Sequence, residues 1–162
     1  MKYDNSHIRR QDRLLDNDRA NRLLRNAEYG VLSICATDGT PYGIPLNYVW
    51  DENDNLYIHC APEGRKLEII RHNANASFCI VGRVNLLPQQ FTTEYESIVL
   101  KGTIQLVDND DERRSAIRLL IQKLSPEYVE KGMMYSEKSF HRVDILKLHI
   151  NEYSGKSKHV IA

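Results

Sequence analysis

The sequence predicts a mainly β protein, a small six-stranded antiparallel barrel with flanking helices. Several stretches alternate apolar and polar residues, as half-buried strands do, and turn sequences such as Asp38-Gly39-Thr40 join them. The chain shows no regular strand–helix–strand alternation, so a doubly wound parallel sheet is not expected. At 162 residues the chain has the size of one domain. We expect a charged N-terminal arm at residues 1–17 and one domain at residues 18–162.

The first half of the chain predicts a helix, three strands and a second helix. Asp18 is the candidate N-cap of a helix over 18–27 that carries Leu23, Leu24 and Ala27 on one stripe. Asp-Gly supplies the positive φ values of a tight turn, so "YGVLSICAT" and "YGIPLNYVW" are expected to pair as a hairpin. "LYIHC" adds a third strand. The apolar spacing of "RKLEIIRHN" then predicts the second helix.

The second half of the chain predicts three further strands and a longer helix. "SFCIVGRV" resumes the sheet, and "ESIVLKGTIQLV" alternates over one long strand, with Gly102 where a barrel would bend. "DNDDERRSAIRLLIQKL" begins with acidic residues and continues with amphipathic spacing, which predicts a helix that ends before Pro126. "FHRVDILKLHI" is the last strand. Its alternation slips between Ile145 and Leu146, as in a bulge or a strand buried on both faces.

Charge and cysteine content exclude several classes of protein. Lys plus Arg and Asp plus Glu number 22 each, so no overall field would attract nucleic acid or an acidic membrane surface. No stretch is apolar enough for a signal peptide or a membrane span, and we expect a cytoplasmic protein. The cysteines share no metal-ligand spacing and lie in strand-like stretches. We therefore expect no metal site and buried, reduced thiols at Cys35, Cys60 and Cys79.

The stretch "HCAPEGRKLEII" places two cations at the beginning of a helix. Because the first turn of a helix carries a partial positive charge, it repels Arg65 and Lys66, where Asp or Glu would be stabilised. A bound phosphate would remove this conflict, since backbone N–H groups, a guanidinium and an ammonium would converge on it. The alternative is that both cations simply solvate a surface turn.

Two neighbouring features also have a functional and a structural interpretation. His59, in the strand before that helix, could donate to a ring heteroatom or act as an acid, or it could be a satisfied polar residue of a half-buried strand. Pro45 lies inside a strand, which is tolerated at a sheet edge or where the ladder is interrupted. An interrupted ladder would leave backbone groups free for a heterocycle. No motif for a catalytic nucleophile is found.

Five phrases occur in a recognisable order: the "GVL" strand, "PLNY", "YIHCAPEGRK", "TTEYESIVLKG" and the terminal "SGK". From about Tyr29 to Lys156 the chain resembles the FMN-binding split barrels of the pyridoxamine 5'-phosphate oxidase-like family, in particular its group of 5-nitroimidazole reductases of nitroimidazole resistance. The long C-terminal extension with which the true oxidases bind pyridoxamine phosphate is not found. Oxidation of pyridoxamine phosphate is therefore not expected.

The resemblance implies a flavin site and a homodimer with the flavin at its interface. Arg65 and Lys66 would hold the FMN phosphate, the backbone of residues 45–48 would line the isoalloxazine edge, and residues 58–60 would lie along the ring or the ribityl chain. Two weaker candidates come from later strands. The implied cofactor-binding residues are Pro45, Leu46, Asn47, Tyr48, Ile58, His59, Cys60, Arg65, Lys66, Ser97 and Lys156.

Two classes of function are compatible with this resemblance. The first is an FMN-dependent oxidoreductase that takes hydride from a nicotinamide nucleotide and reduces a small acceptor such as a nitro-aromatic or a quinone, with the flavin doing the chemistry. The second is a non-catalytic carrier or sensor that binds FMN or haem. A haem Soret band, or a bound flavin that NADH and NADPH do not bleach, would favour the second class.

Overall fold

One curved sheet forms most of the structure. The computed structural model describes residues 1–159, where eight strands form a sheet of order β3-β2-β6-β7-β8-β5-β4, with β1 paired to β8. The β1–β8 pairing is parallel and the others are antiparallel. The strands are β1 (Lys2–Tyr3), β2 (Tyr29–Cys35), β3 (Pro41–Asn47), β4 (Val49–Trp50), β5 (Asn55–Cys60), β6 (Asn75–Leu87), β7 (Thr92–Leu106) and β8 (Asp144–Lys158).

The expected mainly β fold with flanking helices is confirmed, but the prediction of six strands is wrong. Within residues 1–159, β1 is a two-residue strand in the segment expected to be an arm. The predicted strand 42–50 is divided into β3 and β4, because Tyr48 between them is not part of either strand. The sheet does not close into a complete barrel, since β3 and β4 remain its two edges.

Tyr48 connects these two edges. β3 and β4 lie at opposite ends of the strand order, yet only Tyr48 separates them in the sequence. Its side chain is fully buried, its hydroxyl donates to the carbonyl of Leu24 at 2.7 Å, and its ring meets Phe78 edge-on with centroids 5.2 Å apart. The buried ring anchors the chain where it passes from one edge to the other. We call this place the split.

Gly102 lies where the long strands change register. The pairing of β7 with β8 shifts between Lys101 and Gly102. A Cβ atom on Gly102 would lie 1.8 Å from the carbonyl oxygen of His149, so only glycine allows the two backbones to approach this closely. The position agrees with the bend expected at Gly102.

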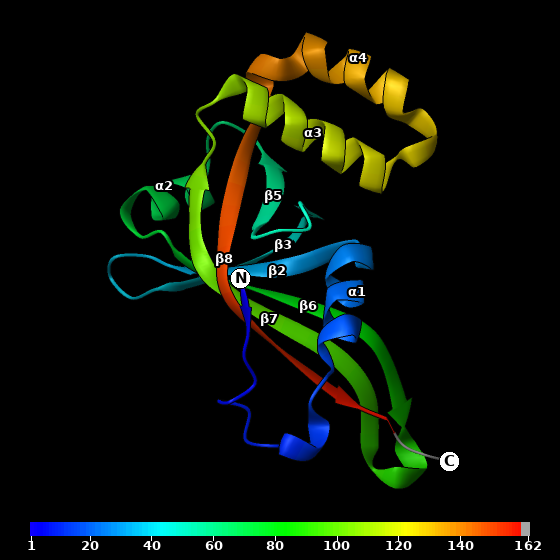
Figure 1. The fold of residues 1–162 in the computed structure, drawn as a ribbon. Coiled ribbons are helices and arrows are strands. Elements are labelled where there is room, and N and C mark those ends of the chain that lie inside the picture. The colour runs from blue at the N-terminus through cyan, green and yellow to red at the C-terminus, as the bar shows by residue number, and fades with distance from the viewer. Residues whose placement is uncertain (160–162) are drawn as a thin grey trace.

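Four α-helices flank the sheet in the described part of the chain (Figure 1). α3 and α4 pack together over one end of the sheet, while α1 packs against β6, β7 and β8. Asp16, rather than the predicted Asp18, caps α1 by accepting the backbone N–H of Arg19 at 2.8 Å. No helix within residues 1–159 is long and apolar enough to cross a membrane. The helices are α1 (Asn17–Asn26), α2 (Arg65–His72), α3 (Asp110–Leu124) and α4 (Val129–Ser139), of which α4 is not among the predicted helices.

Two apolar clusters hold these layers together. Leu146 belongs to the larger cluster inside the curved sheet, and its neighbour Ile145 belongs to a smaller cluster beneath α3 with Ile117. Both β8 residues are 0% exposed. The slip in alternation between them therefore marks a strand buried on both faces, the second of the two predicted explanations.

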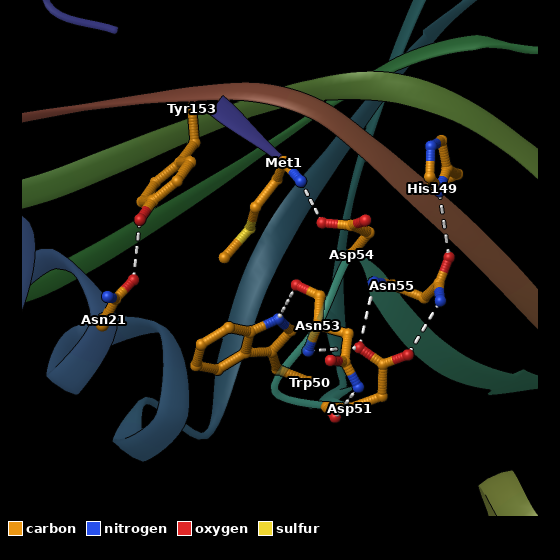
Figure 2. Close-up of polar contacts among 9 residues, drawn as sticks. All are labelled: Met1, Asn21, Trp50, Asp51, Asn53, Asp54, Asn55, His149 and Tyr153. Carbon is orange, nitrogen blue, oxygen red and sulfur yellow. Dashed lines mark hydrogen bonds and ion pairs between the residues drawn. The ribbon is translucent and has the colours of Figure 1, made fainter. Parts of the chain in front are cut away.

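The N-terminal segment lies along the sheet. β1 pairs with β8, Leu15 is buried, and the amino group of Met1 forms an ion pair with Asp54 in the turn between β4 and β5 (Figure 2). In that turn, the Asp51 carboxylate accepts the backbone N–H of Asn53 at 2.9 Å. The division of the chain into an arm and a domain stays a prediction.

Candidate functional site

A hollow of about 300 Å³ lies at the split. β3 is an edge strand, so one side of its backbone has no partner within the sheet and keeps polar groups available to a ligand. The edge position also explains how the ladder tolerates Pro45. The hollow therefore combines free backbone groups with aromatic and imidazole side chains. Its walls are Tyr29, Pro45, Leu46, Asn47 and His59.

β5 presents His59 to this hollow and buries the residues on either side. Ile58 and Cys60 belong to the apolar cluster inside the sheet, with 0% and 7% exposure, whereas His59 is exposed. Burial raises the pKa of the Cys60 thiol to about 11, although the nearby Lys66 ammonium opposes the shift. The thiol is therefore protonated at neutral pH. Of the three predicted contacts on β5, only His59 presents its side chain here.

The start of α2 brings two cations to one point. Gly64, with a φ of +127°, precedes the helix, and no side chain in the described part of the chain caps its first turn. Arg65 is exposed, and its guanidinium lies 5.0 Å from the centre of the Tyr42 ring. Lys66 is half-buried. The Gly64 carbonyl accepts the backbone N–H groups of Leu67 at 2.9 Å and Glu68 at 3.3 Å, so the backbone N–H groups of the first two helical residues, together with their cationic side chains, are the donors left for an anion.

β3 links this cationic point to the hollow at the split. Tyr42, which the Arg65 guanidinium covers, lies near the beginning of β3, and Asn47 is its last residue. A strand rises about 3.3 Å per residue, so these two positions are about 17 Å apart. The arrangement fits an elongated ligand that is anionic at one end and carries a polar planar group at the other.

Ser97 and Lys156 lie in another part of the sheet. They are directly opposite each other in the β7–β8 ladder, and these strands are three and four places from β3 in the strand order. At about 4.8 Å per strand, the distance from β3 is about 14 to 19 Å along the sheet. A single chain does not bring these two predicted contacts to the hollow.

The sequence did not point to two features of the site. Tyr29, which is 59% exposed, lies opposite Asn47 in the β2–β3 ladder and lines the hollow. One signal in the sequence could have indicated Tyr29: it is an aromatic residue at the start of the strand before the predicted edge strand. The second feature is a groove between α3 and α4 that also reaches His59, and it depends on a helix that the sequence did not predict.

The described residues form neither a metal-ligand cluster nor a disulfide. No group of three or more His, Cys, Asp or Glu that could hold a metal ion occurs within residues 1–159. The cysteines are free; Cys60 is buried, and Cys35 and Cys79 are half-buried.

An antiparallel sheet that curves round without closing, with a hollow between its two edges, defines the class of this protein, a split barrel. The model of the family described as pyridoxamine 5'-phosphate oxidase matches residues 16–157, so the chain belongs to this family. No curated protein matches the chain.

Several solved structures share the fold. A protein of Bacteroides thetaiotaomicron, proposed to confer 5-nitroimidazole antibiotic resistance, is 22% identical with a TM-score of 0.70, over 89% of this chain and 85% of that one. The FAD and haem binding protein of Mycobacterium smegmatis is 19% identical with a TM-score of 0.78, over 91% and 74%. The flavocytochrome Anf3 of Azotobacter vinelandii is 21% identical with a TM-score of 0.73, over 90% and 68%. At these identities the likeness establishes the fold.

Proposed function

We propose that this protein binds FMN at the split and acts as an NADH- or NADPH-dependent oxidoreductase that reduces a small acceptor, such as a nitro-aromatic or a quinone. The observation that carries the proposal is the cation pair at the uncapped start of α2, joined along β3 to a hollow with free backbone groups. The FAD and haem binding protein and the flavocytochrome among the similar structures support a flavin as the cofactor, and the choice of FMN rests on the resemblance given above. The free cysteines agree with a reducing compartment such as the cytoplasm.

The residues present fit a flavin nucleotide from end to end. Arg65, Lys66 and the backbone N–H groups of α2 would hold the phosphate, and the free edge of β3 would pair with the ring. Tyr48 would contribute only backbone, because its side chain is fully buried. His59 would orient the ring from β5. When bound, FMN supplies the ring that accepts hydride and passes electrons on.

The position of Ser97 and Lys156 supports a homodimer. Neither residue lines the hollow at the split within one chain, so a second copy would bring them to the flavin. The β6–β7 hairpin carries exposed apolar side chains suited to such an interface, with Leu86 69% and Phe91 97% exposed. We expect light scattering to give twice the 18.8 kDa of one chain. A species of single-chain mass at micromolar concentration would contradict the dimer.

FMN titration of single-residue variants tests the phosphate site. Each charge-assisted hydrogen bond to the phosphate is worth about 1.5–3 kcal/mol, so Arg65→Ala and Lys66→Ala should each weaken FMN about ten- to a hundredfold. Riboflavin, which lacks the phosphate, should bind all variants alike. Arg71→Ala removes an exposed cation from the last turn of the same helix and serves as the matched control. If all three variants bind FMN as the wild type does, the phosphate lies elsewhere.

An anaerobic absorption spectrum tests the reaction class. We expect a flavin spectrum that NADH or NADPH bleaches and that a nitro-aromatic or quinone restores. A flavin that neither nucleotide bleaches would indicate a carrier. A Soret band after purification would indicate a haem protein of the same fold.

A further inference from the structure

A second hollow, of about 240 Å³, lies between α3 and α4, and His59 is part of its wall. α3 contributes aliphatic side chains to its wall, and α4 contributes Tyr135 and two serines. We call it the α3–α4 groove. Figure 1 shows these two helices side by side over the end of the sheet to which β5 belongs. The wall residues used below are His59, Leu120, Ile121, Leu124, Tyr135 and Ser136.

The wall of the α3–α4 groove is mostly apolar. No Asp, Glu, Lys or Arg of the described chain lines it. The hydroxyls of Ser136 and Ser139 donate to the carbonyls of Met133 and Tyr135 in their own helix, each at 2.9 Å, and so do not act as free polar anchors. An uncharged, largely apolar molecule suits such a wall, whereas a charged one would lose its hydration and find only a few uncompensated polar partners, such as the His59 imidazole and the Tyr135 hydroxyl.

The size of the groove limits the ligand to a small molecule. An apolar cavity of about 150 Å³ is enough for benzene, so 240 Å³ holds a substituted single ring or a compact pair of rings. At Gly132 a Cβ atom would lie 2.8 Å from Cγ2 of Ile121, which shows that α4 packs closely against α3 there. This close packing leaves room for a planar ring rather than for a polypeptide segment.

His59 lines both the α3–α4 groove and the hollow at the split. A ligand in the groove would therefore lie next to the group held at the split, with the imidazole beside both. We propose that the α3–α4 groove is the binding subsite of the electron acceptor, and that it selects small uncharged aromatic molecules. This inference rests on the proposed function, because it needs a flavin at the split to supply the electrons.

Amide chemical-shift mapping with a pair of matched ligands tests the subsite. The probe is 4-nitrobenzyl alcohol, an uncharged nitro-aromatic, and the control is 4-nitrobenzoate, which has the same ring with a carboxylate. The FMN-loaded protein should show shifts at Leu120, Leu124 and Ser136 with the alcohol, and about tenfold weaker binding of the benzoate.

Variants that fill the groove provide a second test of the subsite. Ser136→Phe and Leu124→Trp fill it from opposite helices, and each should weaken binding of the alcohol about tenfold or more while FMN affinity stays unchanged. Met134→Phe adds the same ring to α4 at a residue that is 65% exposed and outside the groove, and should bind as the wild type does. Circular dichroism confirms that each variant is folded.

The outcomes separate the subsite from the proposed function. If FMN binds but the alcohol shifts other amides, or both filling variants bind the alcohol as the wild type does, the subsite is overturned and the proposed function stands. If the benzoate binds as tightly as the alcohol, the selection of uncharged acceptors is overturned. If the wild type does not bind FMN, the proposed function fails, and the role of acceptor subsite fails with it.

Discussion

Lys123 of α3 lies behind the split and is expected to lower the stability of the protein. Within residues 1–159, its Nζ atom is one of two fully covered side-chain nitrogens that have no hydrogen-bond partner. The ammonium lies 3.8 Å from the centre of the Tyr48 ring, which is its attractive contact. Burial lowers the pKa of Lys123 from 10.5 to about 8. The charged form is therefore less stable in the folded protein than in water.

The size of the effect follows from this pKa. A drop from 10.5 to about 8 corresponds to about 3 kcal/mol at about 1.4 kcal/mol per pH unit. The Nζ atom is covered, but the residue as a whole is only half-buried, so solvent lies near enough to screen the charge and we retain about half of that penalty. Replacement by methionine also forfeits the cation–π contact with Tyr48. We expect Lys123→Met to raise the free energy of unfolding by about 1 kcal/mol at pH 7.

The pH dependence identifies the cause. Because the folded-state pKa of Lys123 lies below the unfolded one, the folded wild type loses this proton first, and its stability rises as the pH increases from about 8 to 10.5. The advantage of Lys123→Met should therefore be full below pH 8 and shrink towards pH 10.5. Guanidinium unfolding of both proteins across this range measures the difference. Lys131→Met, at an exposed position of α4, should show neither effect.

Two results would refute the reasoning about Lys123. A loss of more than about 1 kcal/mol in Lys123→Met at pH 7 would mean that the lysine stabilises the fold through the Tyr48 ring. A gain that stays constant between pH 7 and pH 10.5 would mean that methionine acts through packing and not through the removal of a charge.

Two further predictions concern the site and the sheet. His59→Ala should change the flavin spectrum or its rate of reduction with little effect on unfolding, whereas His72→Ala should leave the flavin unchanged; the reverse result in stopped-flow reduction would show that His59 does not face the ring. Gly102→Ala should lower the free energy of unfolding by about 1–3 kcal/mol, because its Cβ would meet the His149 carbonyl; Gly43→Ala, whose Cβ would lie 3.8 Å from its nearest neighbour, is the control.

Residues close together in the sequence were sufficient to predict much of the fold. Gly39, with a φ of +85°, makes the predicted turn between β2 and β3. Asn109 caps α3 by accepting the backbone N–H of Glu112 at 2.9 Å, in the acidic start from which that helix was predicted. Each of these features is decided by residues within a few positions of one another. Sequence patterns describe such features well.

The elements that the sequence did not reveal depend on distant contacts. The final residues of β8 contain few apolar side chains, yet they extend the strand because they pair with residues 95–100 of β7. Gly155 also allows Tyr3 and Leu15 to approach its backbone. A Cβ atom at Gly155 would lie 2.6 Å from the Tyr3 hydroxyl. Similarly, Gly132 permits the contact between α4 and Ile121, and a glycine within a weakly amphipathic stretch does not suggest a helix.

In the candidate site too, features set by neighbouring residues were predicted, and features set by distant contacts were not. The cations at the start of α2 were predicted from charge and helix polarity alone, and β3 from Pro45 and the turn before it. The distance that separates Ser97 from β3 could not be read from the chain, because it depends on the order of strands in the sheet. The resemblance implied that a partner chain would supply some of these contacts, but it did not indicate which ones.

The structure also distinguishes the two cations at the start of α2. Arg65 already has compensation without a ligand, since its guanidinium lies over the Tyr42 ring. It also lies close enough to Asp38 to help lower the pKa of that carboxyl, after the larger effect of hydrogen bonds from the backbone N–H and the hydroxyl of Thr40. Lys66 is half-buried, and no ion pair with an acidic residue is found for it in the described chain. To bind Arg65, a phosphate must compete with Tyr42 and Asp38. To bind Lys66, it has no such competitor. Lys66→Ala should therefore weaken FMN more than Arg65→Ala does.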